Sequence, residues 1–163
     1  MLVNIPYHRE NVKKYAEAWA LKRNPKFIDF ETMGGDCTNF ASQCIFSGCN
    51  IMNYTPVTGW YYMSSYNRTA SWSGVEFLHN FLTSNQSVGP YAVVTDVSKA
   101  EIGDIIQLGD ADYHYYHSPV VVGFDKQEIL LAAHSFDVYG KPLSGYHYFV
   151  TRCLHIQGVR KYG

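Results

Sequence analysis

The order of helical and extended patterns along this chain constrains its fold more than any other feature. Apolar residues recur at helical spacing over residues 9–23 and 37–48, and again over 75–83 after a Ser73–Glu76 capping box. Beyond Gly89-Pro90 the pattern changes to short β-rich runs, at residues 91–94, 104–108, 117–124, 129–133 and 146–156. Helices followed by strands predict an α+β fold, with N-terminal helices packed on an antiparallel β-sheet.

Length and charge narrow the choice of architecture and partner. The 163 residues suit one domain spanning residues 1–163, and we expect a monomer. Thirteen Lys and Arg against fourteen Asp and Glu give a net charge of −1 without a basic run, which argues against a nucleic-acid partner. No stretch reaches the ~20 apolar residues of a membrane span, and the first residues lack the apolar core of a signal peptide.

The four cysteines are not arranged as a disulfide scaffold or a zinc site. Their spacing contains no CxxC pair, so we expect free thiols at Cys37, Cys44, Cys49 and Cys153.

Cys37 is the candidate nucleophile. It follows Gly34-Gly35-Asp36 and opens the second helical pattern, so the helix dipole and unpaired N–H groups favour a thiolate there. The same N–H groups can receive the oxyanion of an attacked carbonyl. Asp36 suits the N-cap position, but its carboxylate opposes a thiolate, so a nearby base is required.

His117 is the candidate base, because it begins the apolar run 118–122 at a strand end. That run returns through residues 129–133 as a hairpin, and pairing Phe124 with Gln127 sets His117 opposite His134. Other turn lengths set it opposite Ser135 or Phe136. His134 is therefore the expected third catalytic residue, with Asp137 as its rival, and we expect Cys37 and His117 to form a thiolate–imidazolium ion pair.

A long polar and aromatic segment, residues 50–72, is predicted to be a functional loop. We expect its side chains to bind substrate, or else to pack over the core. With Asp36, the candidate substrate-binding residues are Trp60, Tyr61 and Trp72.

The motifs resemble those of the putative amidase domain family, which belongs with papain-like bacterial wall hydrolases of the NlpC and CHAP types. The resemblance rests on Gly34-Gly35-Asp36-Cys37-Thr38-Asn39-Phe40, Gly103-Asp104-Ile105-Ile106, His117-Ser118-Pro119-Val120-Val121-Val122 and Leu131-Ala132-Ala133-His134. It implies a single papain-like amidase domain with Cys37 as nucleophile, His117 as base and His134 in the third position. It also implies a cofactor-free enzyme acting on peptidoglycan or a related peptide, secreted or bound to the cell wall; a cytoplasmic location is the alternative.

Two other readings compete with a cysteine amidohydrolase. His114, His117 and His134 could ligate zinc in a metallohydrolase, although His114 and His117 point to opposite faces if their segment is extended. The chain could also be a non-catalytic cell-wall binding module whose aromatic residues grip glycan or peptide.

Overall fold

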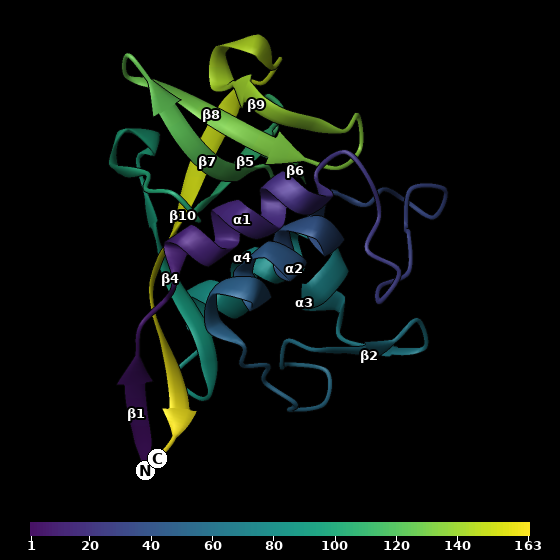
Figure 1. Ribbon diagram of the computed structural model, residues 1–163, viewed down its shortest axis with the longest axis vertical. Coiled ribbons are helices and arrows are strands. Elements are labelled where there is room, and N and C mark those ends of the chain that lie inside the picture. Colours follow the sequence, from purple (N-terminus) through teal and green to yellow (C-terminus); the bar gives the residue numbers. More distant parts are fainter.

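The computed structural model describes residues 1–163 as an α+β fold in which helices cover one face of a curled antiparallel sheet (Figure 1). The sheet has eight strands in the order β1-β10-β5-β7-β8-β9, with β4 paired to β10 and β6 paired to β5. The helices are α1 (Arg9–Trp19), α2 (Cys37–Cys49), α3 (Ala70–Ser73) and α4 (Val75–Ser84). The strands of this sheet are β1 (Leu2–Ile5), β4 (Gly89–Thr95), β5 (Ile105–Gly109), β6 (Tyr115–His117), β7 (Val120–Asp125), β8 (Glu128–Ala133), β9 (Val138–Pro142) and β10 (Val150–Tyr162).

All strand pairs are antiparallel, which confirms the predicted class. Strand β10 runs the full height of the molecule and pairs with β1 at its far end, so the two termini lie together (Figure 1). A separate hairpin, β2 (Tyr62–Ser64) with β3 (Asn67–Arg68), interrupts the predicted loop. None of the helices is long and apolar enough to cross a bilayer.

The three expected helices are present with changed ends. Helix α1 stops at Trp19 rather than Arg23. The Trp19 carbonyl accepts hydrogen bonds from the ring of His134 at 2.8 Å and, in a turn, from the Lys22 N–H at 3.3 Å. The Ser73–Glu76 capping box is absent: Gly74 is the N-cap of α4, and Glu76 binds Arg152. Residues 70–73 form the short helix α3 instead.

The register expected for the β7–β8 hairpin is wrong. Its turn consists of Lys126 and Gln127, both in the left-handed region (φ 49° and 73°), so Asp125 rather than Phe124 closes the hairpin against Glu128. A bulge follows between Val121 and Gly123. The expected single strand over residues 117–124 is also broken at residues 118–119, so His117 lies in β6 opposite Leu108 and not opposite His134.

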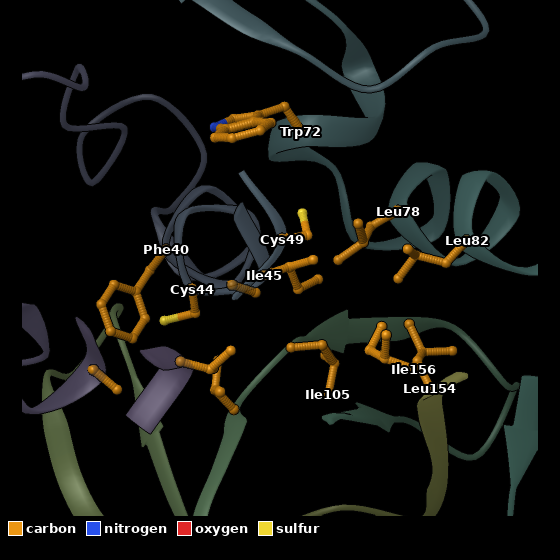
Figure 2. Packing of buried hydrophobic residues seen from close by; sticks show 14 of the residues in the cluster. Phe40, Cys44, Ile45, Cys49, Trp72, Leu78, Leu82, Ile105, Leu154 and Ile156 are labelled. Carbon is orange, nitrogen blue, oxygen red and sulfur yellow. The ribbon is translucent and has the colours of Figure 1, made fainter. Parts of the chain in front are cut away.

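Helix α2 lies at the centre of the core. Figure 2 shows it between α4 and Trp72 on one side and the sheet on the other. Its side chains Phe40, Cys44 and Ile45 are fully buried, and burial of each large apolar side chain contributes roughly 1.5–3 kcal/mol. A smaller apolar cluster packs on the opposite face of the sheet, formed by Ile106, Leu108, Val121, Ile129, Leu131, Leu143 and Cys153. The position of Cys37 at the first turn of α2 is therefore fixed by the core.

Candidate active site

Cys37 is the first residue of α2, as expected. The chain enters the helix through Gly34 and Gly35, whose φ angles of 103° and 106° disfavour any residue with a Cβ. Asp36 occupies the N-cap position, but its carboxylate makes no capping hydrogen bond to the helix. The Asp36 carboxylate therefore leaves the first N–H groups of α2 uncapped, although that of Thr38 hydrogen-bonds to the Cys37 sulfur. N–H groups at such a helix start can receive a negative oxygen.

The sulfur of Cys37 is held in a nearly enclosed polar setting. The residue is 8% exposed, and its Sγ lies 3.7 Å from Oγ1 of Thr38. Burial raises the pKa of the thiol and the Asp36 carboxylate adds to this, while hydrogen bonds from Thr38 and from the Ser118 main chain act to lower the pKa. Since burial is the largest effect, Cys37 is a thiol rather than a thiolate at neutral pH.

The main chain of Ser118 hydrogen-bonds to the Cys37 sulfur, and His117 is the residue before Ser118. Its own ring packs 5.8 Å from the Tyr146 ring, and no hydrogen bond joins it to Cys37. Burial, with a smaller effect of Lys141, lowers the pKa of His117 to about 4. The imidazole is thus neutral at pH 7 and able to accept a proton, and the expected ion pair is absent from the substrate-free site.

His134 does not orient His117. Its ring is buried and stacked on Phe40, with centroids 4.1 Å apart. Its Nδ1 bonds Oδ2 of Asp36 at 2.5 Å, and its Nε2 lies 2.8 Å from the Trp19 carbonyl oxygen. The ring thus bridges the carboxylate that precedes Cys37 and the last carbonyl of α1. His134 therefore fixes Asp36, the residue before the nucleophile.

Asp36 is a structural residue and not a substrate contact. It is 1% exposed, and its Oδ1 accepts hydrogen bonds from the Phe30 main chain and from the Asn39 amide. Asp137, the rival for the third catalytic position, forms a two-point ion pair with Arg23 (2.7 and 3.1 Å). Asp137 therefore binds the segment that follows α1, and no hydrogen bond joins it to His117.

The tryptophans expected to bind substrate are part of the core. Trp60 and Trp72 have no exposed surface and pack with their rings tilted and their centroids 4.7 Å apart. Their indole N–H groups donate to Ser42 and Asn39 of α2. They therefore cannot contact a substrate in this structure. Tyr61 is partly exposed and remains a candidate for substrate contact. This burial excludes the two tryptophans from any surface that a wall-binding module would use.

The histidines of the zinc reading are not gathered. The His114 side chain is 80% exposed, and it pairs with Asp110 in a turn. The one set of potential ligand atoms that lie close together is Asp110, Asp112 and His114. His117 and His134 belong to different surroundings, so the zinc site proposed from sequence does not form.

Three polar residues beside Cys37 were not singled out from the sequence: Thr38, Ser118 and Gln107. All are essentially buried, and hydrogen bonds join Thr38 to Ser118 and Ser118 to Gln107. One feature of the sequence does indicate this group: Gln107 is a polar residue inside an otherwise apolar strand, where a buried side chain needs a polar partner.

Comparison with known proteins supports an amidase. Residues 6–156 match the family model described as "Putative amidase domain", which indicates amide hydrolysis. The chain is also 33% identical over 137 residues, 80% of its length, to "Uncharacterized protein YhbB" of Bacillus subtilis (strain 168). It spans 42% of that relative's length. No solved structure matches the chain.

Proposed function

Because the chain belongs to the putative amidase domain family, we propose that it is a cysteine amidohydrolase with Cys37 as nucleophile and His117 as general base. The observation that carries this proposal is the position of Cys37 at the uncapped start of α2, with the main chain next to His117 against its sulfur. A helix start supplies both the nucleophile and N–H donors for the oxyanion.

The charge states at rest set the order of proton transfer. Thiol and imidazole are both neutral, so His117 takes the Cys37 proton as the sulfur attacks the carbonyl carbon. The oxyanion is received by N–H groups at the start of α2. Collapse forms a thioester and expels the amine, which takes the proton from His117. His117 then removes a proton from water, whose oxygen adds to the thioester carbonyl. Collapse breaks the C–S bond and releases the acid, and the Cys37 sulfur takes the proton back from His117.

The sulfur and imidazole are not hydrogen-bonded in the free protein, and the mechanism requires them to meet when substrate binds. Catalytic hydrogen bonds are often long in substrate-free structures and tighten only in the substrate complex. His117 is the last residue of β6, and residues 118–119 lie outside the strands, although the Pro119 carbonyl accepts a hydrogen bond from the Ile106 N–H at 2.9 Å.

We propose peptidoglycan or a related peptide as the substrate. The motif resemblance to papain-like wall hydrolases of the NlpC and CHAP types supports this choice. Cys37 lines none of the larger hollows, the greatest of which, about 640 Å³, lies elsewhere between Val97, Phe124 and Leu143.

Digestion of purified peptidoglycan, with mass spectrometry of the new amine and carboxyl ends, tests the proposal and identifies the bond cleaved. We expect Cys37→Ala to abolish product and His117→Ala to lower the rate by orders of magnitude. Cys49→Ala is the matched control, because it removes another buried thiol of the same helix. Full activity of Cys37→Ala would rule out the mechanism, while activity on soluble peptides alone would reject only the polymer substrate.

A further inference from the structure

A chain of buried polar side chains runs from the Cys37 sulfur into the sheet. Oγ1 of Thr38 lies 3.7 Å from the sulfur and donates to Oγ of Ser118 at 3.2 Å. Nε2 of Gln107 donates to the same Ser118 oxygen at 3.1 Å. Thr38 and Ser118 are 1% exposed and Gln107 is fully buried, so water does not supply these groups with alternative partners.

The direction of the amide at the end of this chain is fixed. Gln107 Oε1 accepts from Nε of Arg152 at 2.8 Å, and its Nε2 also donates to the Val75 carbonyl at 2.9 Å. Arg152 is held in turn by Glu76 and by the ring of Tyr115. A flipped amide would face donor to donor and acceptor to acceptor, so Gln107 always donates to Ser118.

The neutral thiol leaves this chain incomplete. With the Cys37 proton directed to Thr38 and the Thr38 proton to Ser118, the Ser118 oxygen accepts two hydrogen bonds. The Ser118 hydroxyl hydrogen then has no acceptor in this chain. A buried hydroxyl hydrogen without a partner costs free energy. The protonated state of the nucleophile is therefore the less satisfied one.

Loss of the thiol proton allows the chain to reverse. Gln107 then donates to Ser118, Ser118 to Thr38, and Thr38 to the sulfur anion, so that every hydrogen has an acceptor. The reversal needs rotation of two O–H bonds and a small turn of the Ser118 side chain, because only Thr38 is aligned as donor of that pair at present. The proton removed from sulfur goes to His117.

We propose that Thr38 and Ser118, with Gln107 as the fixed donor, form a two-hydroxyl relay that stabilises the Cys37 thiolate during catalysis. The inference rests on the proposed function, in which Cys37 is the nucleophile. Thr38 contacts the reacting atom, while Ser118 and Gln107 are positioning residues that act through it.

Other charged and titratable groups around the sulfur also affect the pKa of the Cys37 thiol, so a test must leave them unchanged. Asp36 on the same helix start disfavours the anion, and it is itself bound by His134 of the segment after β8 and approached by Arg23 of the segment after α1. His117 approaches from β6. None of these is altered by substitutions at Thr38 or Ser118.

The test is the pH dependence of Cys37 alkylation by iodoacetamide, followed by peptide mass spectrometry on the whole chain. Thr38→Val keeps the shape and removes the hydroxyl. We expect the pH of half-maximal rate to rise by about one unit and the rate at neutral pH to fall about tenfold. Thr38→Ser keeps the hydroxyl and should restore the profile, and Ser118→Ala should produce a smaller shift in the same direction.

Thr69→Val is the matched control, because it also removes a buried threonine hydroxyl but one that bonds Tyr61 and Ser71. An unchanged profile in both Thr38→Val and Ser118→Ala, or an equal shift in Thr69→Val, overturns the relay. If Thr38→Val does not fold, Ser118→Ala decides alone by the same criterion. Alkylation measures the reactivity of the Cys37 sulfur and not turnover, so the two proposals can fail separately. The alkylation profile can be unchanged although Cys37→Ala abolishes hydrolysis, and it can shift although Cys37→Ala leaves hydrolysis intact.

Discussion

At the scale of single residues, the environment of His117 determines how the proposed enzyme responds to acid. Burial and the charge of Lys141 together lower its pKa to about 4, against about 6.5 for an exposed histidine. The neutral, proton-accepting form therefore persists well below neutral pH.

We predict that the acid limb of the kcat/KM profile falls near pH 4. Lys141→Gln removes a positive charge that disfavours the imidazolium, so its limb should move to higher pH. Lys161→Gln, at the far end of β10, is the control and should leave the limb in place. A limb that stays fixed in Lys141→Gln, or one at the pKa of an exposed histidine, contradicts this assignment of the base.

The same lowered pKa has a consequence for stability. The unfolded chain binds the His117 proton at about pH 6.5 and the folded chain only near pH 4. The contribution of neutral His117 is complete above pH 6.5 and is lost as pH falls towards 4. Urea unfolding measured over this interval should show a shallower pH dependence in His117→Gln than in the parent chain.

At the scale of elements, the buried pair of His134 and Asp36 joins three parts of the fold. The ring bonds the last carbonyl of α1, stacks on α2 through Phe40 and follows directly after β8. The Asp36 carboxylate accepts hydrogen bonds from the Phe30 main chain, before α2, and from the Asn39 side chain in its first turn. This pair therefore sets the position of the first turn of α2, from which Cys37 extends.

We predict that His134→Ala lowers the free energy of unfolding by about 3–5 kcal/mol, because it leaves a buried carboxylate without its partner. Urea denaturation followed by circular dichroism gives the value. His114→Ala is the control, since that ring is 80% exposed, and its unfolding should be unchanged within error. A wild-type midpoint for His134→Ala would show that Asp36 does not depend on this ring.

The elements that depend on local pattern were predictable from the sequence, and those that depend on distant pairing were not. The periodicity around Phe40 and Ile45 located α2, and with it Cys37. Strand β1 escaped notice because four residues carry no clear alternation and pair only with the opposite end of the chain. The partners of His134 were missed for a related reason: a left-handed turn and a bulge, neither evident in the residue types, changed the register.

At the scale of the whole molecule, Asp104 connects the N-terminal helix to the centre of the sheet. This fully buried carboxylate pairs with Arg9 of α1 at 2.8 Å and with His155 of β10 at 2.7 Å. It also accepts hydrogen bonds from the main-chain N–H groups of Ile156 and Glu101. Arg9 also donates to two main-chain carbonyls, that of Ile102 just before β5 and that of Ile156 in β10. Helices and sheet should therefore unfold together.

We predict that Asp104→Ala lowers the free energy of unfolding by about 3–5 kcal/mol, because it leaves the Arg9 guanidinium and two main-chain donors without their shared acceptor. Glu101→Gln is the matched control: its carboxylate reaches Arg9 and His155 at 3.9 and 3.5 Å but is 59% exposed, so its loss should cost less than about 1 kcal/mol. Urea titrations followed by both far-ultraviolet circular dichroism and tryptophan fluorescence measure the change. In the parent chain and in Glu101→Gln the two transitions should coincide, because the Asp104 carboxylate that joins α1 to β10 couples the helical layer to the sheet. Separate transitions in the parent chain, or equal losses for the two substitutions, would show that Asp104 does not couple these layers.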